Sequence, residues 1–150
     1  MADHPEVFER TITVQATAAD VFAFVRDLDN LPRYLPTVEQ ATREGREKIR
    51  IKGNAHGHIY DGEGYFRVDE DRLRMEWGAI GDRHYSGWLT VIRGDVDPSV
   101  TEIKLHLEMI PRKIHEPALQ GGSSAGDQVL LAMEKALISI QNHVEKVQVM

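Results

Sequence analysis

The spacing of hydrophobic residues changes once along this chain, and that change constrains the fold more than any other feature. Between residues 38 and 109, apolar and polar residues alternate in successive segments. Alternation with a period of two is typical of strands that bury one face, as in an antiparallel sheet. From residue 129 to 147, apolar residues instead recur every three or four positions, which predicts a long amphipathic helix.

The alternating region divides into strands at clusters of turn residues, which recur at hairpin spacing and predict a meander. The expected strands include 48–55, 60–68, 73–77 and 101–109.

Upstream of this region, residues 7–14 alternate as well. Thr17 and Asp20 then have the spacing of a helix N-cap and predict a short helix. A second short helix is expected over residues 29–34. The long helix at the end of the chain must bury its apolar stripe against the concave face of the sheet. We therefore predict an α+β helix-grip fold, in which a curved antiparallel sheet of about seven strands wraps around a long C-terminal helix, with two short helices after strand 1.

Length and composition limit the function classes. A chain of 150 residues predicts a single domain over 1–150. The lack of cysteine excludes disulfides, a thiolate nucleophile and Cys-ligated metals. A net charge of -6 argues against nucleic acid as a partner. The polar N-terminus lacks a signal core, and no segment approaches the roughly 18 apolar residues of a transmembrane helix. We expect a cytoplasmic protein with no transmembrane segment.

Several short sequence motifs resemble those of a known superfamily. They are Ile12–Val14, Ala16–Phe22, Asp27, Asn30–Pro36, Arg74–Trp77, Gly87–Trp88, Thr101 and Pro111. Together with the order of elements, they resemble the START-like, or Bet v 1-like (SRPBCC), superfamily, within it the polyketide cyclase/dehydrase and coenzyme-Q-binding type branch. The resemblance implies the helix-grip fold across nearly the whole chain. The superfamily holds lipid carriers, aromatase/cyclases, hydrolase-like members and chaperone activators, so the motifs mark fold rather than function.

A sheet wrapped around one helix often leaves a gap that is a natural ligand site. We predict that this gap binds a small hydrophobic molecule: a lipid, a quinone or a polyketide-like aromatic. The alternative for Trp77, and for Met133 and Leu137 on the helix, is plain core packing. The predicted lining residues are Phe8, Ile12, Ile51, Tyr60, Phe66, Met75, Trp77, Leu105, Leu107, Met133 and Leu137.

A second hypothesis is an enzyme of the polyketide cyclase/dehydrase kind acting in the same cavity. No recognisable catalytic set is present, so the candidates are the single residues Arg10, Tyr60 and His84. Arg10 lies on the apolar side of its strand, where it grips an anionic group of a ligand, pairs with an internal acid or reaches water at the strand edge. The buried hydroxyl of Tyr60 needs a ligand or a backbone group as its partner, and His84 either transfers protons or lies in a solvated loop.

Three further features leave questions open. His56, His58 and Glu63 resemble the first metal motif of the cupins, but the second motif is missing, and we predict neither a metal nor another cofactor. The segment 111–126 is rich in Pro, Gly and Ser and predicts a linker or a loop that gates the cavity. The third hypothesis is a protein-interaction module, and a homodimer remains open as an assembly.

Overall fold

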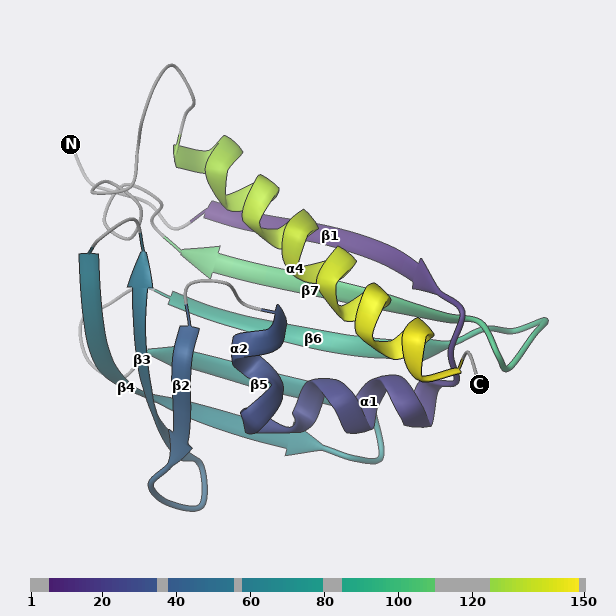
Figure 1. Cartoon of the computed structure of the whole chain (residues 1–150), viewed down its shortest axis with the longest axis horizontal. Coiled ribbons are helices and arrows are strands. Elements are labelled where there is room, and N and C mark those ends of the chain that lie inside the picture. Colours follow the sequence, from purple (N-terminus) through teal and green to yellow (C-terminus); the bar gives the residue numbers. More distant parts are fainter. Residues whose placement is uncertain (1–5, 35–37, 56–57, 80–84, 110–124, 149–150) are drawn as a thin grey trace.

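The computed structural model describes residues 6–34, 38–55, 58–79, 85–109 and 125–148, and within them one seven-stranded antiparallel sheet curves around the helices (Figure 1). The strand order is β1-β7-β6-β5-β4-β3-β2, so β1 and β2 form the two edges. The strands are β1 (Glu6–Val14), β2 (Val38–Arg43), β3 (Lys48–Ala55), β4 (His58–Asp69), β5 (Arg74–Ala79), β6 (Tyr85–Arg93) and β7 (Thr101–Met109). This sheet confirms the predicted helix-grip architecture.

The helices also agree with the predicted order. They are α1 (Ala18–Arg26), the 3-10 turn η1 (Leu28–Asn30), α2 (Leu31–Tyr34) and α4 (Ala125–Gln148). Thr17 is the N-cap of α1, and its hydroxyl accepts a hydrogen bond of 3.2 Å from the Asp20 backbone N–H, as the spacing predicts. None of the described helices is long and apolar enough to cross a bilayer.

Two local predictions differ from the structure. The expected helix over 29–34 begins as the tight turn η1, because the Asp27 carboxylate accepts from the Asp29 N–H at 3.0 Å and closes a short cap. Leu73 was expected to open a strand, but it lies in the turn before β5 with a φ of 51°, a left-handed conformation that is rare for leucine. Its side chain still packs against the core, so burial accounts for the apolar residue there.

The core lies between the concave face of the sheet and the buried face of α4. α4 contributes Val129, Met133, Ala136, Leu137, Ile140 and Val144. α1 contacts α4 and β6, and α2 contacts α4 and β2. Figure 1 shows α4 crossing the sheet above β1 and β7, with α1 and α2 together at one end.

Candidate functional site

The strand register decides which side chains face α4. In the β1–β7 pair, Phe8 lies opposite Leu107 and Ile12 opposite Ile103. Since opposite residues in an antiparallel pair share a face, the concave face can be followed from strand to strand. Its two ends differ in the size and burial of their side chains.

One end of the concave face, called here the packed end, is filled by bulky side chains with almost no exposure. Its sheet residues are Val14, Met75, Leu89, Val91 and Ile103. α1 covers this end with Val21, Phe22 and Val25, which are also buried. A polar contact reinforces it, because the buried Thr101 hydroxyl donates to the Ala16 carbonyl oxygen at 2.6 Å.

The other end, called here the small-residue end, consists of Ile51, Gly62, Gly64, Trp77, Gly87 and Leu107. Gly62 lies opposite Ile51, and Gly87 lies between Trp77 and Leu107 in the register. A Cβ on Gly87 would be 2.6 Å from Leu107 Cδ2 and 2.8 Å from Trp77 Cζ2, so these two side chains lean over the glycine. Ile51, Trp77 and Leu107 are only partly buried, and they pack at the border of the core.

The predicted ligand-binding residues fall into two groups. Six of them are buried in the core: Phe8, Phe66, Met75, Leu105, Met133 and Leu137. Four are partly buried and pack against it: Ile12, Ile51, Trp77 and Leu107. The eleventh, Tyr60, lies opposite Gly53 in the sheet, and its side chain falls outside what the structure describes. The described members thus lie on two facing surfaces, the concave face of the sheet and the buried face of α4, and their contact with a ligand stays a prediction.

Arg10 lies partly exposed on the edge strand, and its partner is an exposed carboxylate rather than an internal acid. Its Nε donates to Glu134 Oε1 of α4 at 3.3 Å, and its Nη1 donates to the Glu9 carbonyl oxygen at 2.9 Å. The Arg10 side chain is 39% exposed and the Glu134 side chain 50% exposed. This ion pair connects the edge strand to the helix, and an exposed pair of this kind adds only about 0–1 kcal/mol to stability.

The remaining candidates lie outside the described residues, in whole or in part. His84 and His56 belong to segments that the structure does not describe, as does most of the segment 111–126. His58 is the first residue of β4, and only its backbone is described. Among the described residues, no cluster of three His, Asp or Glu side chains is arranged to hold a metal ion.

The two tryptophans lie on opposite faces of the sheet. Trp77 faces the concave side, whereas Trp88 belongs to the outer face. There Trp88 stacks on His106 with ring centroids 4.8 Å apart, and the Arg74 guanidinium lies 4.4 Å from the Trp88 ring centroid. His106 Nδ1 is 2.7 Å from Glu9 Oε2, and this hydrogen bond lowers the pKa of the Glu9 carboxyl. Trp88 is therefore part of a surface cluster rather than of the ligand wall.

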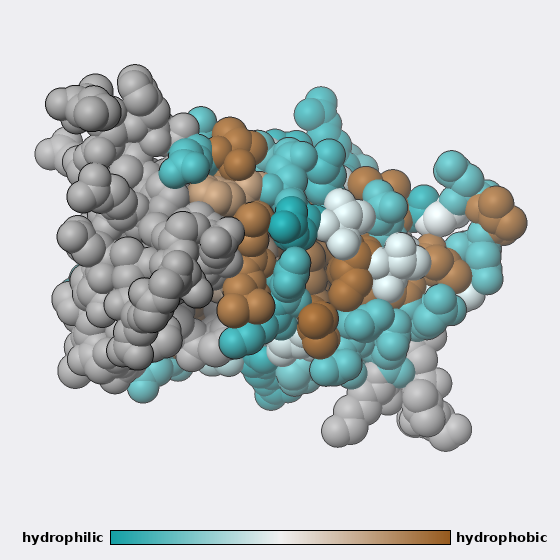
Figure 2. All heavy atoms as spheres, turned by 90° about the horizontal axis from the view of Figure 1, so that it is seen from above, coloured by the Kyte–Doolittle hydropathy of each residue, from teal (hydrophilic) through white to brown (hydrophobic). Residues whose placement is uncertain are grey.

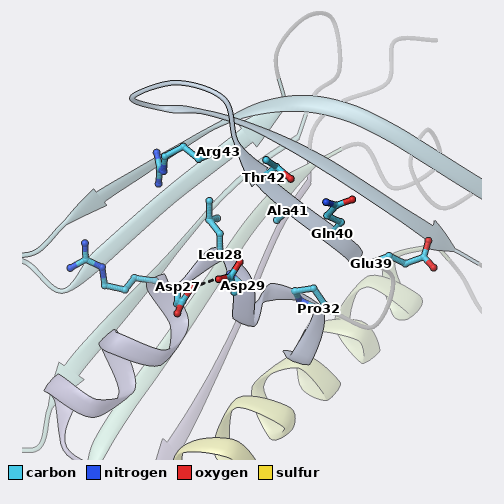
Figure 3. A pocket seen from close by; sticks show the side chains of 10 residues that line it. Asp27, Leu28, Asp29, Pro32, Glu39, Gln40, Ala41, Thr42 and Arg43 are labelled. Atoms are coloured by element: carbon cyan, nitrogen blue, oxygen red, sulfur yellow. Dashed lines mark hydrogen bonds between the residues drawn. The ribbon is translucent and has the colours of Figure 1, made fainter.

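Sequence reasoning missed a depression of about 600 Å³ between the α1–α2 connection and β2 (Figure 3). Leu28 and Ala41 form the apolar part of the wall of this depression and pack against the core. Arg26 is paired with Glu70, and Arg43 donates to the Arg46 carbonyl oxygen at 2.8 Å, so both cations of the depression have partners. Its lining residues are Arg26, Asp27, Leu28, Asp29, Pro32, Glu39, Gln40, Ala41, Thr42 and Arg43. A polar rim has no hydrophobic period, so no pattern in the sequence marks it.

One buried polar side chain near this depression has a structural explanation. The Tyr34 hydroxyl donates to the Val25 carbonyl oxygen at 2.9 Å, and burial, followed by the charge of Asp27, raises its pKa far above the ordinary value. A phenol that stays neutral and is bonded to the backbone holds α2 against α1 and is not a proton donor for a ligand.

Comparison with known proteins agrees with the helix-grip fold. The family model described as "Polyketide cyclase / dehydrase and lipid transport" matches residues 5–137. No curated protein matches the sequence.

Solved structures share the fold at low sequence identity. The Zhui aromatase/cyclase from Streptomyces has a TM-score of 0.69 at 19% identity, with 95% of each chain covered. A START superfamily protein from Mycobacterium smegmatis has a TM-score of 0.71 at 13% identity, covering 94% of this chain and 98% of that one. The di-domain ARO/CYC BexL has a TM-score of 0.71 at 20% identity, covering 97% of this chain, which spans only 48% of BexL.

Proposed function

Because the chain belongs to the polyketide cyclase / dehydrase and lipid transport family, we propose that it binds a small hydrophobic molecule between its sheet and α4. The proposed ligand is a lipid, a quinone or a polyketide-like aromatic, and residues 1–150 act as one binding domain. A cytoplasmic location and the absence of cofactors and nucleic-acid partners remain predictions.

The observation that carries this proposal is the difference between the two ends of the concave face. Positions 62, 64 and 87 are glycines where the packed end has valine, leucine and methionine, and the space over Gly87 is taken by Trp77 and Leu107. Beside Gly62 and Gly87, the side chains of Ile51, Trp77 and Leu107 keep part of their surface accessible, whereas Ile49 opposite Gly64 is buried. Filling such a surface with an apolar ligand is favourable by about 25 cal/mol for each Å² removed from water.

The helix supplies the opposite wall. Met133 and Leu137 are buried on the face of α4 that meets the sheet, and Leu130 is partly buried beside them. Methionine adapts its shape to different partners, which suits a site that accepts a flat or flexible apolar ligand.

Native mass spectrometry of the purified protein tests for a co-purifying small molecule. Titration with palmitic acid, a short-chain ubiquinone and dihydroxyanthraquinone, followed by intrinsic tryptophan fluorescence, then tests binding directly. We expect saturable binding of at least one probe, with a change in the emission of Trp77. A protein that carries no small molecule and binds none of the three probes would contradict the proposal.

A matched pair of variants separates the concave face from the rest of the strand. Ile51→Trp places a large side chain at the small-residue end and is expected to weaken binding at least tenfold. Lys52→Trp adds the same side chain to the exposed outer face of the same strand and should leave binding unchanged. Equal loss in both variants would mean that the ligand does not lie on the concave face.

A second candidate is catalysis on the bound ligand, as in a polyketide cyclase/dehydrase. Two structural neighbours, an aromatase/cyclase and a di-domain ARO/CYC, favour it. Here the fold would hold a reactive chain in one conformation, and Arg10, Tyr60 or His84 would move protons. With a poly-β-ketone analogue, Arg10→Met should slow formation of the cyclised product without changing affinity, whereas Arg33→Met, an exposed control, should change neither.

A further inference from the structure

Hydrophobic surface is arranged differently in two parts of the molecule. Seen from above, the described residues show exposed hydrophobic side chains interspersed with polar ones (Figure 2). Scattered residues of this kind are normal for a folded protein and indicate no binding site. The depression between η1 and β2 differs, because its apolar wall of Leu28 and Ala41 is partly buried and packs against the core. It is a hollow at which the polar surface meets the interior of the fold.

The strand register connects this depression to the small-residue end. Ala41 lies opposite Ile51, and Ile51 lies opposite Gly62. Opposite residues of an antiparallel pair share a face, with their Cβ atoms about 4.5–5.5 Å apart. Ala41 and Ile51 are both partly buried, so accessible hydrophobic surface continues from the depression to the small-residue end.

The connecting strip is one residue wide. On β3, Ile49 and Gly53 lie two residues to either side of Ile51 on the same face, and both are buried. Beside Ile49, Arg43 extends over the Phe66 ring, with its guanidinium carbon 5.8 Å from the ring centroid. A strip with buried or covered neighbours on both sides suits a single alkyl chain better than a fused ring system.

Hydrogen bonds hold the helical wall of the depression in place. Asn30 Nδ2 donates to the Phe24 carbonyl oxygen at 2.9 Å and connects η1 to α1. Ser139 Oγ of α4 donates to the Arg33 carbonyl oxygen at 2.8 Å and fixes α2. A wall that is already ordered loses little conformational entropy when a ligand binds. The depression is therefore preformed.

The polar rim indicates which head group fits the depression. Arg26 is paired with Glu70, and Arg43 is bound to the β2–β3 turn, so both cations are engaged. The side chains of Asp29 and Glu39 are exposed and form no hydrogen bond or ion pair among the described residues. Ionised carboxylates only accept hydrogen bonds, whereas an ammonium group carries three donors. The free groups of the rim thus favour a donor with a positive charge over a carboxylate or a phosphate.

We propose that the depression is the polar subsite of the ligand site, and that the ligand is a single-chain amphiphile with a cationic, hydrogen-bond-donating head group. The head group lies against Asp29 and Glu39, and the alkyl chain follows Ala41 and Ile51 to the small-residue end. This inference rests on the proposed function, because it names the class of ligand that the same site takes.

Three probes with one chain length test the head group. Decylamine, decanol and decanoic acid are titrated at neutral pH and about 0.15 M salt, with intrinsic tryptophan fluorescence as the readout. Decylamine should bind at least tenfold more tightly than decanoic acid, with decanol between them. Equal affinity for the amine and the acid would overturn this inference and leave the proposed function standing. Binding of none of the three would contradict both.

A pair of double variants separates the depression from the overall negative charge. Asp29→Asn with Glu39→Gln should reduce the preference for decylamine over decanol at least fivefold, because the free acceptors lose their charge. Glu102→Gln with Glu108→Gln makes the same change in net charge on the exposed outer face of β7 and should leave that preference unchanged. Equal reductions in the two double variants would mean that the amine is held by overall charge, which overturns the inference.

Methyl NMR on the wild-type protein locates the bound amine. Decylamine should shift the methyl signals of Leu28 in the depression and of Ile51 on the strip. Leu131, a leucine of α4 that is 51% exposed, is the control and should not shift. Saturable binding of decylamine without a shift at Leu28 would contradict the proposed subsite.

Discussion

The packed end and the small-residue end lie on one face of one sheet, yet they are built for different tasks. At the packed end, the side chains of Ile103 and Met75 are almost completely buried. At the small-residue end, glycines alternate with side chains such as Ile51 and Trp77 that keep some exposure. The first end accounts for the stability of the fold, and the second offers a surface on which a ligand can complete the core. Substitutions at matched positions test this division.

The largest difference is expected between two isoleucines. Ile103→Ala removes a fully buried side chain and should lower the free energy of unfolding by about 3–4 kcal/mol, because the cavity cannot relax. Ile51→Ala removes a partly exposed one and should cost about 1 kcal/mol. Urea unfolding measures both. Equal losses would mean that the small-residue end is packed as tightly as the other end.

A smaller difference is expected between two threonines. Thr101→Val leaves the Ala16 carbonyl oxygen without its partner at the packed end and should cost about 1–3 kcal/mol. Thr90 Oγ1 is buried without a hydrogen-bond partner among the described residues. Thr90→Val should therefore be neutral or slightly stabilising, which differential scanning calorimetry can show. A large loss in Thr90→Val would reveal a partner for this hydroxyl.

The smallest effect is expected on the outer face, at Glu9 and His106. The pKa of the Glu9 carboxyl is lowered in the folded state, first by its hydrogen bond to His106. A lowered carboxyl pKa stabilises the fold above the unfolded pKa, and this contribution is lost as the pH falls through the folded pKa. His106→Ala should raise the Glu9 pKa toward 4.5, as a carboxyl carbon NMR titration would show, and should leave probe binding unchanged. An altered affinity would mean that the two faces are coupled.

Much of this architecture follows from residue patterns. Alternation identifies β1 and β7, the Thr17 cap identifies the start of α1, and the helical period identifies α4. These predictions succeed because burial of one face imposes a period on the sequence. Leu73 misleads, because a turn residue that is buried carries the same apolar signal as a strand residue.

The candidate site is less predictable from sequence. Parity places Ile51, Trp77 and Leu107 on the concave face but cannot separate them from the buried Met75 and Leu105. That separation depends on the register, which puts glycines beside some hydrophobic residues and bulky side chains beside others. The depression beside β2 is invisible for a related reason, since its lining combines residues from segments that share no period.

The central claim is that a hydrophobic ligand occupies the small-residue end and leaves the packed end unchanged. Methyl NMR on protein labelled at Ile, Leu and Met side chains tests it most directly, in titrations with palmitic acid and with dihydroxyanthraquinone. We expect large shifts for the methyl groups of Ile51, Leu107 and Met133, and only small ones for Met75, Ile103 and Ile140. Shifts confined to the second group, or no shift with either probe, would contradict it.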